Sequence, residues 1–155
     1  MAGDVRGAGV IRIVVRGMPA PQGSKSVKGM TRAGRAILTE SSKKVKPWRL
    51  AIKAAAEEFR ARSGMAPIDG PVVASMVFTM PKPKSAPKTR RTYPMRTPDL
   101  SKLLRSTEDA LTDAGIWTDD ARVIRYDRLS KVYPNEGIDA LDSPGCVIEI
   151  WEVCE

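Results

Sequence analysis

The sequence predicts a single small α+β domain in which a mixed β-sheet packs with two main helices. The chain has 155 residues, enough for one domain with its own core, and hydrophobic residues make up 42% of it. Only two stretches show helical periodicity, and the segments around them have the composition of strands. No internal repeat is visible, so we expect residues 1–155 to form one domain.

The N-terminal part of the chain predicts a strand followed by a hairpin. Residues 9–17, GVIRIVVRG, are rich in β-branched side chains and begin with an apolar–polar alternation, which is typical of a strand. A loop rich in Pro and Gly comes next. Residues 26–40 are then interpreted as an irregular hairpin, in which Gly29 and Gly34 are candidates for the turn.

The first helix is expected over residues 42–63. Pro47 lies in its first turn or marks its start, because proline is tolerated there. Gly64 and Pro67 are expected to end the helix, and the apolar run 70–80 predicts the next strand. Apolar residues at helical spacing predict its buried face: Trp48, Ile52, Ala55 or Ala56, and Phe59.

Residues 81–98, PKPKSAPKTRRTYPMRTP, contain six basic residues, five prolines and no acidic residue. Such a segment forms neither a sheet nor a helix, because proline lacks the amide donor and fixes its own backbone. Neither flank is a complete domain by itself. We therefore expect a mobile or extended loop within one domain.

The second helix follows this basic segment. Thr97 is the expected N-cap, Pro98 the expected first-turn residue and Gly115 the expected stop. Residues 121–133 predict a strand, and residues 146–153 predict the closing strand after a polar loop. Five residues at helical spacing predict the buried face of the second helix: Leu100, Leu103, Leu104, Thr107 and Leu111.

The charge balance indicates a polyanionic partner. Lys and Arg number 26 against 18 Asp and Glu, a net charge of +8, and nucleic acid is the simplest partner for such an excess. A basic protein without such a partner is the alternative. No apolar run is long enough to span a membrane and no signal peptide is visible, so we expect a cytoplasmic protein without a membrane partner.

The composition also narrows the chemistry. The absence of His excludes catalysis by histidine, and with only two Cys a structural zinc site is not expected. Cys146 and Cys154 lie on one predicted strand, roughly 26 Å apart, so they are expected to stay reduced. Hydrolysis would then depend on carboxylates, a metal ion, Lys, Ser or Tyr.

Carboxylates stand at both ends of the second helix. Asp99 fits a helix start and the pair Asp119–Asp120 fits a turn, so each has a purely structural interpretation. Paired carboxylates from two elements are also what Mg²⁺ binds, together with water and substrate phosphate. We expect the strand after Asp120 to run back along the helix and bring the acids together. Only one of the two adjacent acids would then point squarely at the site.

The basic segment is the candidate for holding nucleic acid beside these acids. Tyr93 is a weak candidate for stacking on a base, and a solvated flexible loop is the alternative interpretation of the whole segment. Six of its side chains are expected to neutralise phosphates: Lys82, Lys84, Lys88, Arg90, Arg91 and Arg96.

One pattern in the chain, PDLxxLLRxxxDALxxAGIWxDDARV, resembles the RusA family of Holliday-junction resolvases. The resemblance is strong over residues 97–130, and the MPAPQGSK loop and the SPGCVIEI segment also fit. It implies a homodimer of small α+β subunits that binds four-way DNA junctions and makes paired symmetric nicks with Mg²⁺ or Mn²⁺. Many relatives are encoded by bacteriophages or prophages, and the same origin is expected here.

The resemblance also assigns residues. Asp99 matches the first catalytic Asp, Asp120 matches the later essential Asp, and Asp119 is its acidic neighbour; these three are the expected metal ligands. Arg105 stands where well-known members have a functional Lys. It is expected to act at the scissile phosphate, with Lys102 as a further DNA contact.

One departure from the family pattern keeps other functions open. The family usually has Asp and then Asn where this chain has Ser101 and Lys102, so one carboxylate is lost. Glu108 and Asp109, further along the helix, are candidates for compensating. The alternatives are a junction-binding protein with weak or no cleavage, and a structural module whose acids merely cap its elements.

Overall fold

The computed structural model describes residues 9–22, 26–30, 36–39 and 43–153. The expected element order is confirmed within these ranges, and a short 3₁₀ helix, η1, is added before the fifth strand. The elements are β1 (Ile11–Arg16), β2 (Ser26–Met30), β3 (Ala36–Thr39), α1 (Val45–Ser63), β4 (Val72–Thr79), α2 (Leu100–Asp113), η1 (Asp120–Arg122), β5 (Val123–Val132) and β6 (Gly145–Glu152).

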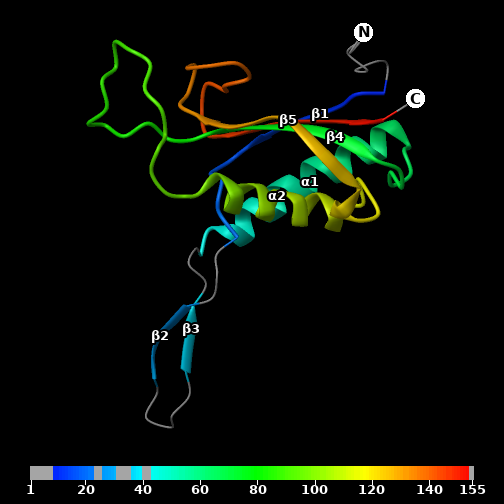
Figure 1. Cartoon of the computed structure of the whole chain (residues 1–155), viewed down its shortest axis with the longest axis horizontal. Helices are drawn as coiled ribbons and strands as arrows, with labels where there is room; N and C mark the ends of the chain where they lie inside the picture. Colours follow the sequence, from blue (N-terminus) through cyan, green and yellow to red (C-terminus); the bar gives the residue numbers. More distant parts are fainter. Residues whose placement is uncertain (1–8, 23–25, 31–35, 40–42, 154–155) are drawn as a thin grey trace.

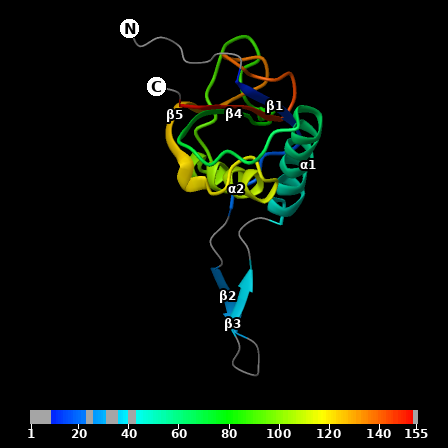
Figure 2. The same ribbon diagram turned by 90° about the vertical axis from the view of Figure 1, so that its right-hand side faces the viewer.

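Four strands form one mixed sheet in the order β1-β6-β4-β5. β4 and β5 are parallel, and the other neighbouring pairs are antiparallel. Figures 1 and 2 show α1 and α2 packed on the same face of this sheet. The predicted α+β class, with a mixed sheet and two main helices in one small domain, is therefore confirmed.

β2 and β3 form a separate antiparallel hairpin, as the sequence predicts. The register of the pair shifts between Val27 and Gly29, which accounts for the irregular pattern of this segment. The hairpin stands away from the body of the molecule in both views (Figures 1 and 2). Gly29, the first turn candidate, is wrong, because it lies within β2 and pairs with Ile37. The second candidate, Gly34, lies outside the described residues.

The core lies between the two helices and the facing side of the sheet. Trp48, Ile52 and Ala56 of α1 are buried as predicted, and the Trp48 indole donates a hydrogen bond to the Thr107 hydroxyl of α2 at 3.2 Å. β4 is buried along its whole length because both of its faces are covered. Alternate residues of the central strands supply the sheet side of the core: Val72, Ala74, Met76, Phe78, Cys146, Ile148 and Ile150.

The buried face of α1 gives a stability prediction. Ile52 is fully buried and Leu50, two residues earlier on the same helix, is 56% exposed. Ile52→Ala should lower the free energy of unfolding by about 2–5 kcal/mol, because it removes transfer energy and leaves a cavity. Leu50→Ala, the matched control, should change it by less than about 0.5 kcal/mol. Urea titrations followed by circular dichroism measure both, and equal losses would contradict this placement of α1.

The bounds of α2 differ from the predicted ones in a way that matters for the site. Asp99 is the N-cap residue, and Thr97 and Pro98 precede the helix instead of starting it. At the other end the helix stops at Asp113, and Gly115 adopts the left-handed conformation (φ +77°) expected of a residue that ends a helix.

Two further expectations concern the cysteines and the membrane. Cys146 is a free thiol buried in the core, as predicted, whereas Cys154 lies outside the described residues. Among the helices that the structure describes, none has the length and apolar character needed to cross a lipid bilayer.

Candidate active site

Asp99 stands at the point where the basic segment becomes α2. Its backbone is extended (φ −67°, ψ 139°), and its carbonyl accepts the amides of Lys102 and Leu103, each at 3.1 Å. Its carboxylate makes no capping hydrogen bond and lies 3.8 Å from the Lys102 ammonium, with 55% of the side chain exposed. The carboxylate is therefore not used as a cap, which weakens the purely structural interpretation of Asp99.

Lys131, near the end of β5, fixes the backbone just before Asp99. Its ammonium donates hydrogen bonds to the carbonyls of Arg96 and Pro98, both at 2.9 Å. The end of β5 is thereby tied to the start of α2. Lys131 thereby holds in place the chain that carries the Asp99 carboxylate.

Asp119 and Asp120 form the turn that leads into β5. The Asp119 carboxylate accepts the Ala121 amide at 2.7 Å, and this bond is the main reason why the pKa of Asp119 lies below its usual value. The pKa of Asp120 is raised, first by loss of solvent and then by a hydrogen bond with Asp119 and by the charges of Asp119 and Asp109. The two neighbours are thus in opposite electrostatic situations: Asp119 is stabilised as an anion, while Asp120 is crowded by negative charge.

Glu108, on α2, belongs to the same group of acids. Its carboxylate is half-buried and accepts a hydrogen bond from the Tyr126 hydroxyl of β5 at 2.7 Å. Burial raises the pKa of Glu108, the Tyr126 bond opposes that rise, and the charges of Asp120 and Asp109 add to it. Burial and the nearby Glu108 charge raise the pKa of Tyr126 far above its usual value, so this side chain stays a neutral donor.

The structure therefore separates the predicted acids into two groups. β5 does run back along α2, as expected, but Asp120 precedes the strand and stays beside the middle of the helix. Glu108 lies nine residues after Asp99, which corresponds to about 14 Å along the helix axis. Within the described ranges, no three acidic, Cys or His side chains gather closely enough to hold a metal ion. The expectation that the returning strand unites the acids is wrong for one chain, because the strand carries Lys131, not Asp120, to Asp99.

The other residues assigned to α2 are accessible. Ser101 and Arg105 are exposed and Lys102 is partly exposed. Within the described part of the chain, the Arg105 guanidinium has neither a hydrogen bond nor an ion pair. It is therefore available to a phosphate.

The basic segment contains neither helix nor strand, as predicted, but it is anchored. Glu136, in the loop after β5, accepts hydrogen bonds from the Lys82 ammonium at 2.7 Å and the Thr92 amide at 2.9 Å. The Lys82 bond is the main reason why the pKa of Glu136 is lowered. Lys82 is thus engaged within the fold, which argues against its predicted role as a DNA contact. The mobility of the segment stays a prediction.

The remaining predicted DNA contacts lie on the surface of this segment. Arg91 stacks over the Tyr93 ring at 4.8 Å from its centroid, and this pairing leaves both side chains exposed. The other exposed basic side chains of the segment are Lys84, Lys88, Arg90 and Arg96.

Sequence reasoning missed Tyr126, Lys131 and Glu136. Each bonds to residues between 18 and 54 positions away in the chain. The alternation of β5 does place Tyr126 on one face of that strand. Nothing in the sequence, however, shows that α2 lies against that face.

Comparison with known families decides which activity this geometry serves. The model of the endodeoxyribonuclease RusA family matches residues 17–139, well over half of the chain. The chain belongs to the RusA family. It is accordingly an endodeoxyribonuclease of the Holliday-junction resolvase type. A search of curated proteins gave no significant match.

The chemistry of the acids suits the divalent ion that a RusA nuclease implies. The side chains around Asp120 supply only oxygen donors, which Mg²⁺ and Mn²⁺ prefer. Burial is the main cause that raises the pKa of Asp120 and of Glu108, and a cation would relieve the repulsion between neighbouring acids that adds to it. The donor type therefore fits, although no cluster of three such side chains forms among the residues that the structure describes.

Proposed function

We propose that this RusA-family chain is a homodimeric nuclease that cuts four-way DNA junctions by paired, symmetric, metal-dependent nicks. The family match carries the proposal, and the exposed Asp99 carboxylate, which makes no capping hydrogen bond, and the crowded acids around Asp120 support it. A divalent ion bound by these acids would polarise the phosphodiester and stabilise the leaving oxygen.

The chain's own residues take the following roles in this proposal. Asp99, Asp119 and Asp120 hold the ion, and Glu108 places further negative charge beside Asp120. Arg105 binds the scissile phosphate, and Lys102, which lies next to Asp99, contacts the DNA backbone. The exposed cations of residues 84–96 hold the duplex arms by contacts that carry no sequence information.

A second subunit would close the gap between the two groups of acids. In a two-fold dimer that sets α2 antiparallel to α2 of the partner, the start of one helix lies beside the far part of the other. Asp99 of one subunit then meets Asp120 of its partner. Each dimer would contain two such composite sites, one for each strand to be cut.

The direct test of the proposal is cutting of a synthetic four-way junction. With Mg²⁺ or Mn²⁺ we expect nicks at symmetric positions in two opposing strands, and with EDTA we expect none. Strands labelled at their 5′ ends and separated on denaturing gels show both the positions and the rates. Undiminished cutting in EDTA would exclude the role assigned to the acids.

The second candidate function is junction binding with little or no cutting, which Ser101 favours. This side chain is exposed on the first turn of α2, two residues after Asp99, and brings no negative charge. If the absence of a carboxylate at position 101 limits cutting, Ser101→Asp should raise the nicking rate about 10-fold or more. It should also lower the Mg²⁺ concentration that cutting needs. Thr97→Asp, an exposed change two residues before Asp99, is the control and should give no such gain.

A further inference from the structure

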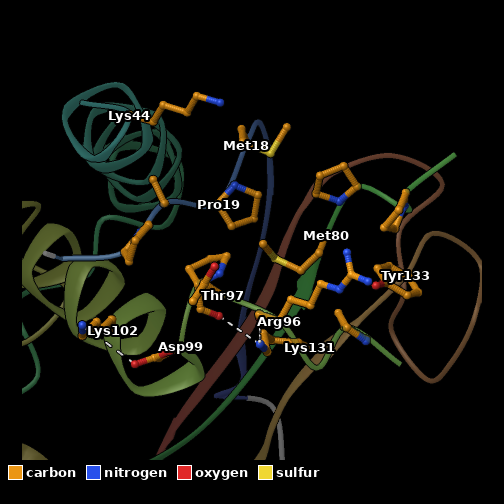
Figure 3. A pocket seen from close by; sticks show the side chains of 16 residues that line it. Met18, Pro19, Lys44, Met80, Arg96, Thr97, Asp99, Lys102, Lys131 and Tyr133 are labelled. Atoms are coloured by element: carbon orange, nitrogen blue, oxygen red, sulfur yellow. Dashed lines mark hydrogen bonds and ion pairs between the residues drawn. The ribbon is translucent and has the colours of Figure 1, made fainter. Parts of the chain in front are cut away.

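A cavity of about 540 Å³ opens beside Asp99 (Figure 3). It lies between the loop after β1, the start of the basic segment, the start of α2 and the end of β5. Its size falls within the range of small-molecule sites, about 300–1,000 Å³. Its lining includes Met18, Met80, Arg96, Asp99, Lys102 and Tyr133.

The walls of this cavity are apolar and stiff. Six prolines contribute to the lining, and Met80 and Tyr133 are buried. The two Lys131 hydrogen bonds fix the backbone on the α2 side. The Lys82 ammonium lies 5.9 Å from the centroid of the Tyr133 ring. Because these walls are already held in place, little conformational entropy is lost when a flat apolar group binds.

Charge is distributed unevenly around the cavity. Four of the lining residues are basic and only Asp99 is acidic. Figure 3 shows Asp99 and Lys102 at one end of the cavity and Arg96 with Tyr133 at the other. An anionic ligand with a flat apolar body satisfies both features, since its body meets the walls and its charge meets the cations.

We propose that this cavity takes the base of an unpaired nucleotide that neighbours the scissile phosphate. The inference rests on the proposed nuclease function and extends it. The base lies against the Pro rings, Met80 and Tyr133, while Lys102 and Arg96 bind the phosphates on either side of it. Bases at a junction centre are the least costly to unstack, and every base has a face that stacks.

Other ligands meet the lining less well. A free phosphate would leave the apolar walls uncovered, and an apolar peptide would bury basic side chains without a partner. A nucleotide satisfies both parts of the site. Because any base can stack there, binding would depend on whether a base is present beside the cut and not on which base it is.

The test is a double-mutant cycle on binding, measured in EDTA so that cutting plays no part. Met18, 41% exposed at the edge of the cavity, is replaced by Trp to fill the opening. Abasic sites are placed one at a time at the nucleotides next to the cut. Met18→Trp should weaken binding of the intact junction about tenfold and leave one abasic junction unaffected, because one base–protein stack is lost. Fluorescence anisotropy gives each affinity.

Met95→Trp is the matched control, since Met95 is 91% exposed and does not line the cavity. It should leave binding unchanged. Pro83→Trp, which fills the cavity from the start of the basic segment, repeats the test if Met18→Trp is poorly folded.

The outcomes separate this inference from the proposed function. Equal effects of Met18→Trp on the intact and on every abasic junction would overturn the base site, even if Mg²⁺-dependent cutting is found. A base-dependent effect without cutting would uphold the site and reject the nuclease. Failure of the wild-type protein to bind junctions would overturn both.

Discussion

Asp120→Asn should abolish junction nicking while leaving junction binding intact. Replacing even a partner of a metal ligand costs about 10–100-fold in activity, so losing the charge of a ligand should cost more than about 100-fold. Asn keeps the shape of Asp but supplies only one weaker oxygen donor. Nicking rates at saturating Mg²⁺ and affinities in EDTA measure the two quantities separately.

The same substitution should not destabilise the protein. Folding raises the pKa of Asp120, so the ionised side chain opposes folding at neutral pH. Removing the charge also relieves Asp119 and Asp109. We therefore expect the melting temperature of Asp120→Asn to equal or exceed that of the wild type, as is typical where charge is crowded for function.

Glu57→Gln provides the control for this prediction. Glu57 is an exposed carboxylate on α1 that forms an ion pair with Lys53 at 3.8 Å. Its loss should change neither nicking nor stability by a measurable amount. If Asp120→Asn cuts as fast as Glu57→Gln, the metal assignment is wrong.

The elements of this fold were predictable because their signals are local. The apolar spacing on α1 and the glycine after it, Gly64, are properties of neighbouring residues, and the helix forms where they indicate. The start of α2 was placed too early because Thr97 and Pro98 are both favoured at helix starts. In the structure Asp99 takes the N-cap position instead.

The site was less predictable because its geometry depends on packing between distant segments. The sequence identifies Asp99, Asp119 and Asp120, but the parallel pairing of β5 with β4 decides which end of β5 meets α2. That pairing allows Tyr126 to hydrogen-bond to Glu108 and Lys131 to hydrogen-bond to the Pro98 carbonyl. A pattern of acids in one chain cannot show whether they meet within that chain or across two.

Mixing two inactive variants should restore activity if the acids meet across a dimer. Asp99→Asn and Asp120→Asn are each expected to be inactive alone. A heterodimer of the two has one composite site with both native acids and one site with neither. Co-expressed subunits with different affinity tags allow this heterodimer to be purified. It should nick one strand of the junction, at about half the wild-type rate of strand cutting, without the paired second cut.

The control pairs Asp99→Asn with the double variant Asp99→Asn/Asp120→Asn. No site in that heterodimer has both native acids, so it should stay inactive in either arrangement. If the first heterodimer is also inactive, although it is dimeric and binds junctions, then both acids must act from one chain. The turn at residues 119–120 would then have to move about 14 Å along α2 to reach Asp99. The Asp119 carboxylate accepts a hydrogen bond within that turn, and Glu108 accepts one from β5. Because such a movement would break these hydrogen bonds, the composite site is the arrangement that leaves the fold intact.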